Sequence, residues 1–198
     1  MKDLIIKISG TSGQGIISAG DILSYATARK GYYVTTYRAF PSEIRGDGKC
    51  YYILRISEEK TLTATGQTDI QICLDEDTIY EMQDKIKPNG VLIYDKDKAG
   101  ELKEVKKDII TYGLPLTTIA KEIQDERSRN MAALGIVVGL LKNLHLEEQI
   151  LKDIELRYKN KPQVVIDSNK KALKAGYDYA VNKLTRKDNF EKAEIKST

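Results

Sequence analysis

A chain of 198 residues, with 41% hydrophobic and 31% charged residues, is long enough to bury a core and has the composition of an ordinary globular domain. The formal net charge of +3, from 32 basic and 29 acidic residues, gives no large positive field of the kind that nucleic acid selects. No apolar run approaches the roughly 20 residues of a membrane span, and the N-terminus lacks a signal-peptide pattern, so we expect a cytoplasmic protein without a membrane or nucleic-acid partner.

Thiol and imidazole chemistry is sparse in this sequence. Cys50 and Cys73 both fall in strand-like runs, and two thiols cannot supply the four ligands of an iron–sulfur cluster. We interpret them as small core residues. His145, the only histidine, falls in a polar break and is expected at the surface. These residues therefore predict no metal site, and they leave His145 as one weak candidate for acid–base catalysis.

The N-terminal stretch Leu4–Ile17 is the most informative part of the sequence for predicting the fold and the candidate site. An apolar run ends in Gly10-Thr11-Ser12-Gly13-Gln14-Gly15 and passes into a helical pattern, as where a buried strand feeds a helix in an α/β domain. Glycines allow the backbone to turn tightly there. The first N–H groups of the helix lack partners inside the helix and would face an anion.

The remaining elements follow from hydrophobic pattern and turn residues. Five further strands are expected: 32–37, 49–57, 70–74, 91–94 and 108–112. The expected helices cover 16–28, about 76–86, about 116–123, about 129–141, 146–158 and 162–184. The segments 4–9, 16–28 and 32–37 read as the start of a βαβ unit.

Strands that alternate with helices predict an α/β fold, with a mostly parallel, doubly wound, Rossmann-like sheet and a C-terminal helical segment. We expect one domain over residues 1–185, helical from about residue 115, and a charged, frayed tail over 186–198.

The glycine loop does not match the common nucleotide-binding fingerprints. Its spacing is neither G-x-G-x-x-G nor G-x-x-x-x-G-K-[ST], and no carboxylate ends the second expected strand at Thr36-Tyr37-Arg38. This disfavours an independent nucleotide-binding enzyme. A tight turn that binds nothing remains an alternative.

A second loop, 38–48, carries Arg38 and Arg45 and leaves the same expected sheet edge. These arginines suggest a rim that binds an anion or a partner, although both would also suit the surface. Gly46-Asp47-Gly48 matches the opening of a thiamine diphosphate metal motif, but the rest of that motif is missing, so we interpret Asp47 as a turn residue. Asn130 fits a position near a helix N-cap, and Asn169 a buried hydrogen-bonding position.

Several segments, in this order and spacing, resemble one family over roughly residues 4–180. They are Gly10–Ile16, Ala19-Gly20, Leu23, Pro41–Gly46, Pro88–Val91, Tyr94-Asp95, Arg129–Met131, Leu134-Gly135, Asn169, Ala172-Leu173 and Gly176-Tyr177. The chain resembles the gamma subunit, or gamma domain, of 2-oxoacid:ferredoxin oxidoreductases, which include pyruvate and 2-oxoglutarate enzymes. Ser12 stands where that family usually has glycine, and Asp47 interrupts a usual glycine pair.

The resemblance implies a subunit of an enzyme that converts a 2-oxoacid, coenzyme A and oxidised ferredoxin to acyl-CoA, CO₂ and reduced ferredoxin. It implies alpha, beta and delta-type partner subunits that carry the thiamine diphosphate, Mg²⁺ and iron–sulfur clusters, with ferredoxin reached through the complex. This chain would be inactive alone and would help to bind coenzyme A. The residues expected to do so are Gly10, Thr11, Ser12, Gly13, Gln14, Gly15, Arg38, Ser42, Arg45, Gly46 and Asn130.

Two alternatives remain open at this point. The chain could be a non-catalytic assembly module whose glycine loop and Arg45 contact protein, or the small subunit of an indolepyruvate ferredoxin oxidoreductase. The sequence names neither the 2-oxoacid nor the oligomeric state, and it does not separate a stand-alone subunit from part of a fused chain.

Overall fold

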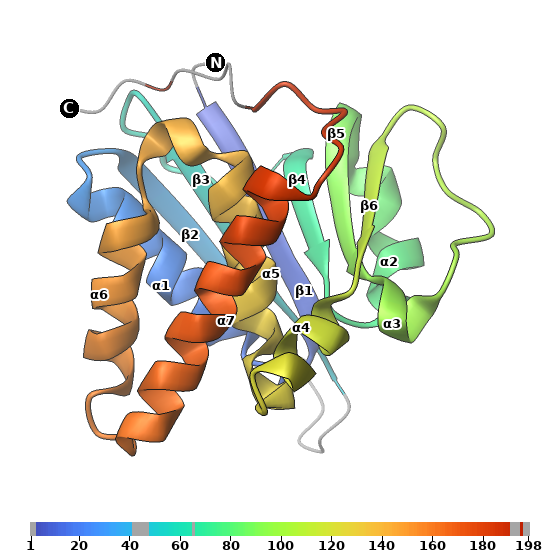
Figure 1. The fold of residues 1–198 in the computed structure, drawn as a ribbon. Coiled ribbons are helices and arrows are strands. Elements are labelled where there is room, and N and C mark those ends of the chain that lie inside the picture. Colours follow the sequence, from blue (N-terminus) through green and yellow to red (C-terminus); the bar gives the residue numbers. More distant parts are fainter. Residues whose placement is uncertain (1–2, 41–47, 65, 191–194, 196–198) are drawn as a thin grey trace.

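The computed structural model describes residues 3–40, 48–64, 66–190 and 195, and these form a six-stranded sheet with helices on both faces (Figure 1). The strands are β1 Asp3–Thr11, β2 Tyr33–Ala39, β3 Lys49–Ser57, β4 Thr68–Cys73, β5 Ile86–Asp95 and β6 Ile110–Leu114. All six predicted strands are present, and β3 has the predicted bounds.

The sheet order is β2-β3-β1-β4-β5-β6, in which β1, β4, β5 and β6 run parallel. The predicted mostly parallel α/β sheet is confirmed. The start of the chain differs from a simple βαβ unit, because β3 lies between β1 and β2 and runs antiparallel to both. The connection from β2 to β3 is only nine residues long, and a short connection of this kind joins antiparallel neighbours.

The described residues form seven α-helices, which are distributed over the two faces of this sheet. They are α1 Ile16–Arg29, α2 Glu76–Met82, α3 Lys96–Ala99, α4 Leu116–Glu122, α5 Arg129–Leu140, α6 Glu147–Tyr158 and α7 Gln163–Asn182. Helices α1, α5, α6 and α7 lie over one face, and α2 packs on the other face over β4 and β5 (Figure 1). The predicted C-terminal helical segment is therefore confirmed.

Alternate residues of the central strands serve two separate cores, as strand geometry requires. Ile72 and Ile93 pack in the larger core beneath α1 and α5. Their neighbours Cys73 and Leu92 pack in a smaller core with Ile79 of α2. The central strand β4 is buried on both faces for this reason, and this burial includes the polar residue Gln71.

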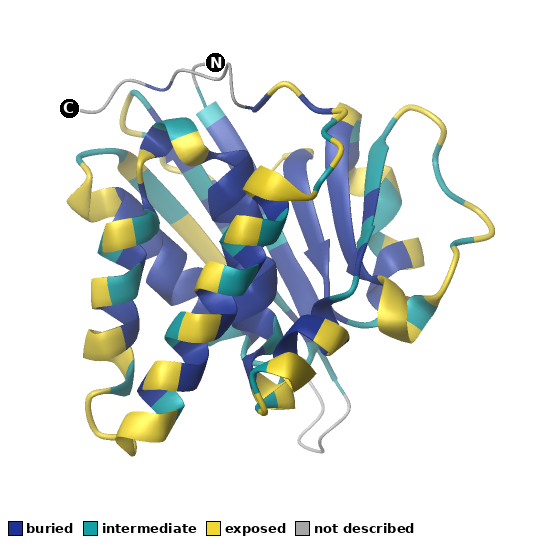
Figure 2. Cartoon of the chain, in the orientation of Figure 1, coloured by how far each residue is buried: buried dark blue, intermediate teal, exposed yellow. Residues whose placement is uncertain are grey.

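Helix α5 is buried almost all round because it lies between the sheet and α7 (Figures 1 and 2). Its contact with α7 uses small residues at close range. A Cβ atom added to Gly135 would come within 2.1 Å of the carbonyl oxygen of Leu173, and one added to Gly176 within 2.0 Å of that of Ala132. The two backbones can approach this closely only because these positions have no side chain.

Strand β5 begins five residues earlier than expected and includes Pro88. Asn89 has a left-handed φ of 61°, and the pairing register between β4 and β5 shifts beside it. The Lys87–Gly90 turn signal therefore marks an irregularity inside the strand rather than a boundary, as expected for a bulge.

The described part of the predicted frayed tail packs against the domain. Asp188 and Phe190 are 9% and 6% exposed. Tyr112 of β6 donates a hydrogen bond to Asp188 at 2.7 Å, and Arg186 donates one to the carbonyl oxygen of Leu140 at 3.1 Å. Burial raises the pKa of Tyr112 to about 12, so its hydroxyl stays a donor at neutral pH. The charged composition of this segment did not reveal the contact, because the few residues that are buried, Asp188 and Phe190, lie among exposed charged residues.

Candidate functional site

The glycine loop joins the carboxyl end of β1 to the start of α1. Gly13 and Gly15 have left-handed φ values of 91° and 74°, which glycine adopts without strain. Gly10 is inside β1, and a Cβ atom there would lie 2.4 Å from Oε1 of Gln14. The predicted strand–loop–helix unit is therefore confirmed: Gly13 and Gly15 provide the left-handed backbone, and Gly10 leaves room for the Gln14 side chain.

Hydrogen bonds hold the loop from three sides. Within the loop, the Thr11 N–H donates to Oε1 of Gln14 at 3.1 Å, and the Gln14 N–H donates to the carbonyl oxygen of Thr11. The Ser12 N–H donates to the carbonyl oxygen of Gly48 at 3.0 Å. Thr11 also donates through its hydroxyl to Asp75, the N-cap of α2, at 2.9 Å. The loop is fixed before any ligand arrives.

Asn130 of α5 supplies the third support, and it lies within the first turn of that helix rather than at its N-cap, Ser128. Its Nδ2 donates to the carbonyl oxygen of Gly15 at 3.1 Å, and its Oδ1 accepts from the Met131 N–H at 3.0 Å. Asn130 is only 5% exposed. Asn130 therefore supports the glycine loop through the backbone of Gly15, and its predicted role in cofactor binding stays a prediction.

The neighbouring residue, Arg129, ties α5 to the sheet through Asp95, the last residue of β5. Asp95 is 2% exposed and accepts hydrogen bonds from Arg129 at 3.2 Å and from the Thr117 hydroxyl at 2.6 Å. It also accepts from the N–H groups of Asp97 and Thr117. One buried carboxylate thus joins β5, α4 and the first turn of α5, and with it the support for the glycine loop.

We expect Asn130→Ala to destabilise the isolated chain by about 1–2 kcal/mol, because it removes two hydrogen bonds and leaves the Gly15 carbonyl oxygen without this donor. Urea unfolding would measure the change. Asn182→Ala, at the exposed end of α7, is the matched control and should stay within about 0.5 kcal/mol of the parent. Equal stability of the two variants would contradict the role of Asn130.

A hollow of about 240 Å³ opens beside the loop. Its lining comes from the loop, the first turn of α1, the end of β2 and the start of β3: Thr11, Ser12, Gly13, Gly15, Ile16, Ile17, Ser18, Phe40 and Cys50. Helix α1 has no side-chain cap and no acidic residue in its first turn. Residues of this turn line the hollow, so the first N–H groups and the positive dipole end of α1 lie beside it, and Phe40, 65% exposed, adds an aromatic surface.

Arg38 differs from its predicted place. It lies in β2 rather than in the following loop, and its Nη2 forms an ion pair with Asp21 of α1 at 2.5 Å. The same carboxylate has a second cationic neighbour, Arg157 of α6, at 3.5 Å. Ser42, Arg45 and Gly46, with Asp47, lie outside the described residues, so their predicted role stays a prediction.

Sequence reasoning missed Ser18, which lines the hollow, and Arg157, which contacts Ser18. Arg157 donates to the Ser18 hydroxyl at 3.4 Å, and Ser18 lines the hollow. The two residues are 139 positions apart, and only the packing of α6 on α1 joins them. In the sequence, Arg157 reads as one of many charges on the exposed face of an amphipathic helix, which gave no signal.

The remaining predicted residues have simpler roles. Cys50 and Cys73 are buried, as predicted, and burial raises the pKa of the Cys73 thiol to about 11, so it stays protonated at neutral pH. His145 is exposed, as predicted. Asn169 is buried and donates to the carbonyl oxygen of Val165 at 2.6 Å, which ties it to its own helix.

The donor set does not fit an iron–sulfur cluster, because two cysteines on β3 and β4 cannot provide four thiolates. Among the described residues, no cluster of three histidine, cysteine, aspartate or glutamate side chains could hold a metal ion. Within the same residues, no helix combines the length and apolar character that crossing a bilayer requires.

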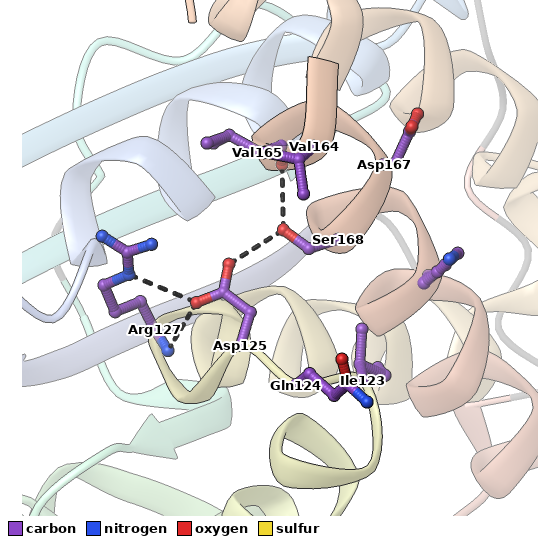
Figure 3. Close-up of a pocket in the computed structure, with 9 residues that line it drawn as sticks. Ile123, Gln124, Asp125, Arg127, Val164, Val165, Asp167 and Ser168 are labelled. Atoms are coloured by element: carbon purple, nitrogen blue, oxygen red, sulfur yellow. Dashed lines mark hydrogen bonds and ion pairs between the residues drawn. The ribbon is translucent and has the colours of Figure 1, made fainter. Parts of the chain in front are cut away.

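A second hollow, of about 400 Å³, lies between the end of α4 and the first turns of α7 (Figure 3). Asp125 points into it and accepts hydrogen bonds from Ser168 at 2.8 Å and from Arg127 at 3.2 Å. Burial opposes the charge on Asp125, but these hydrogen bonds outweigh it and lower the pKa of the carboxyl. The Asp125 carboxylate therefore already accepts hydrogen bonds from Ser168 and Arg127 of the protein itself.

Comparison with known proteins identifies the family. The model of the pyruvate ferredoxin/flavodoxin oxidoreductase family matches residues 5–179. The chain belongs to this family. It is 29% identical over 180 residues to ketoisovalerate oxidoreductase subunit VorA of Methanothermobacter marburgensis, covering 90% of this chain and 37% of that relative.

Two solved structures of the family share the fold. The 2-oxoglutarate:ferredoxin oxidoreductase of Magnetococcus marinus, with 2-oxoglutarate, coenzyme A and succinyl-CoA bound, superposes with a TM-score of 0.88 at 32% identity, covering 100% of this chain and 33% of that one. The gamma subunit of a keto/oxoacid ferredoxin oxidoreductase from Geobacter sulfurreducens gives a TM-score of 0.73 at 26% identity, covering 90% of this chain and 98% of that one.

The resemblance to a gamma subunit or gamma domain of this family is therefore confirmed. The chain spans about a third of the length of the curated VorA relative and of the Magnetococcus marinus chain, and nearly the whole of the Geobacter sulfurreducens gamma subunit.

Proposed function

We propose that this chain is the gamma subunit, or gamma domain, of a 2-oxoacid:ferredoxin oxidoreductase and helps to bind coenzyme A. The enzyme would convert a 2-oxoacid, coenzyme A and oxidised ferredoxin to acyl-CoA, CO₂ and reduced ferredoxin. The observation that carries the proposal is the uncapped first turn of α1, which opens into a hollow bounded by the glycine loop and Phe40.

The chemistry of the hollow suits a nucleotide-containing thiol carrier. The N–H groups of the α1 terminus bind phosphate oxygens, and the hydroxyl of Ser18 is a further donor. The exposed ring of Phe40 offers a surface for stacking of adenine. The similar Magnetococcus marinus enzyme was solved with coenzyme A bound, which supports this class of ligand.

The chemical steps belong to other subunits under this proposal. Thiamine diphosphate, Mg²⁺ and iron–sulfur clusters supply decarboxylation and electron transfer there, on alpha, beta and delta-type partners that also deliver electrons to ferredoxin. This chain would bind and orient the coenzyme. Anaerobic purification of the tagged chain from its own cells should therefore recover a brown complex of larger subunits that contains thiamine diphosphate.

We expect Ser12→Asp to raise the KM for coenzyme A in that complex by about tenfold or more, because it places a carboxylate at the exposed loop beside the phosphate site. The KM values for the 2-oxoacid and for ferredoxin should not change. Steady-state kinetics of the purified complex would measure all three.

Leu62→Asp is the matched control for added charge. Leu62 is 93% exposed, and it follows the end of β3 that lies at the opposite end of the sheet from the glycine loop. Leu62→Asp should therefore leave the KM for coenzyme A unchanged.

An unchanged KM for coenzyme A in Ser12→Asp, with the complex intact, would favour the alternative of an assembly module whose loop contacts protein. Turnover of indolepyruvate in preference to other 2-oxoacids would assign the chain to the indolepyruvate branch.

A further inference from the structure

Two arginines share one aspartate beside the proposed coenzyme site. Asp21, in the second turn of α1, is 4% exposed. Its Oδ1 pairs with Nη2 of Arg38 at 2.5 Å, and its Oδ2 lies 3.5 Å from Nη1 of Arg157. The two guanidinium groups come from β2 and α6, and both of these elements contact α1. We call these three residues the Asp21 cluster.

The charges of the Asp21 cluster do not cancel. One carboxylate balances one of two permanently charged guanidinium groups, so one positive charge is left over. The side chains of Arg38 and Arg157 are 42% and 40% exposed, whereas that of Asp21 is 5% exposed. The two guanidinium groups are therefore accessible to solvent, whereas the Asp21 carboxylate is buried.

Further contacts hold both guanidinium groups in place. The Arg38 guanidinium carbon lies 5.5 Å from the centre of the Tyr52 ring. Nη2 of Arg157 donates to the Ser18 hydroxyl at 3.4 Å. Arginine that is already oriented loses less side-chain freedom when it binds an anion, which favours recognition of a phosphate by paired N–H donors.

The cluster is continuous with the hollow at the α1 terminus. Ser18 both lines that hollow and accepts the hydrogen bond from Arg157. A ligand whose diphosphate lies at the α1 N-terminus therefore has the Asp21 cluster at the next turn of the same helix. Coenzyme A carries a second phosphate group, a monoester on its ribose, close to the diphosphate.

We propose that Arg157 and Arg38 bind this ribose phosphate, with Asp21 as the residue that positions them. The inference rests on the proposed function and deepens it: the site selects coenzyme A over its analogue without the ribose phosphate, dephospho-coenzyme A. The Asp21 cluster recognises the ribose phosphate and so provides the selectivity. The N-terminus of α1 and the glycine loop bind the diphosphate, which both ligands carry.

The test compares the two ligands by calorimetric titration of the assembled complex. The parent should bind coenzyme A at least tenfold more tightly than dephospho-coenzyme A. Arg157→Ala should reduce that ratio to about threefold or less by weakening coenzyme A alone, and Arg157→Lys should retain part of the ratio because the charge remains. Co-purification of the partner subunits would show that each variant is assembled.

Arg29→Ala is the matched control. Arg29 also lies on α1, pairs with a buried aspartate, Asp153, and has a side chain that is 46% exposed, but it is at the other end of the helix. It should leave the ratio unchanged. Equal affinity of the parent for both ligands, or an equal loss for both in Arg157→Ala, would overturn the inference and leave the proposed function standing. Failure of the parent to bind either ligand would overturn both.

Discussion

Asp95→Ala is expected to destabilise the chain by about 3–5 kcal/mol, the larger of two strong effects predicted for the scaffold of the site. The carboxylate is buried and accepts from two backbone N–H groups, the Thr117 hydroxyl and the Arg129 guanidinium. Its removal leaves the guanidinium, on a side chain only 15% exposed, without its charged partner. Breaking a buried pair from one side carries a cost of this size.

Urea unfolding of Asp95→Ala beside Glu101→Ala would measure this effect. Glu101 also pairs with a basic residue, Lys96, but its side chain is 79% exposed, so its loss should cost less than about 1 kcal/mol. The double variant Asp95→Ala/Arg129→Met should recover part of the loss, because it no longer buries an unpaired charge. If Asp95→Ala and Glu101→Ala unfold at the same urea concentration, the carboxylate does not join the elements as described.

Gly176→Ala should destabilise the chain by about 3 kcal/mol, although alanine is the better helix former by about 1 kcal/mol. The added Cβ atom would lie 2.0 Å from the carbonyl oxygen and 3.2 Å from the Cα atom of Ala132. Backbone atoms cannot rotate away, so α7 must move off α5. Overpacking of a tight contact carries a cost of this order.

Lys174→Ala is the control for Gly176→Ala, because Lys174 lies on the exposed face of the same helix. It should change the free energy of unfolding by less than about 0.5 kcal/mol. Thermal and urea unfolding of both variants would compare them. A rise in stability for Gly176→Ala, as helix propensity alone predicts, would show that the two helices can separate at no cost.

Local pattern was sufficient to predict most of the individual elements. Turn glycines and polar breaks located α1 and β3 to within a residue or two, because those signals are local in the chain. The order of the strands could not be predicted in the same way. Whether β3 pairs with β2 alone or also inserts beside β1 depends on which strands use its two hydrogen-bonding edges, and the alternation of side chains does not specify this.

The candidate site likewise combines features that local sequence predicts with contacts between distant residues that it does not predict. The glycine loop was predicted from its residues, because three glycines between an apolar run and a helical pattern are typical of a tight strand-to-helix turn. Asn130 was named through the family resemblance, but its contact with Gly15, 115 residues away, could not be read from the sequence. Arg157, which is distant in the sequence from both Asp21 and Ser18, was missed. Contacts of this kind depend on how α5 and α6 pack on α1, and a charge on an exposed helix face looks the same with or without such a partner.

The insertion of β3 beside β1 couples the residues that flank the connection between β2 and β3 to the glycine loop. Ala39 pairs with Tyr51, Gly10 pairs with Cys50, and the Gly48 carbonyl oxygen accepts a hydrogen bond from the Ser12 N–H. A change that shifts Ala39 or Gly48 would therefore be transmitted through the sheet to the start of α1, far from its own position in the chain.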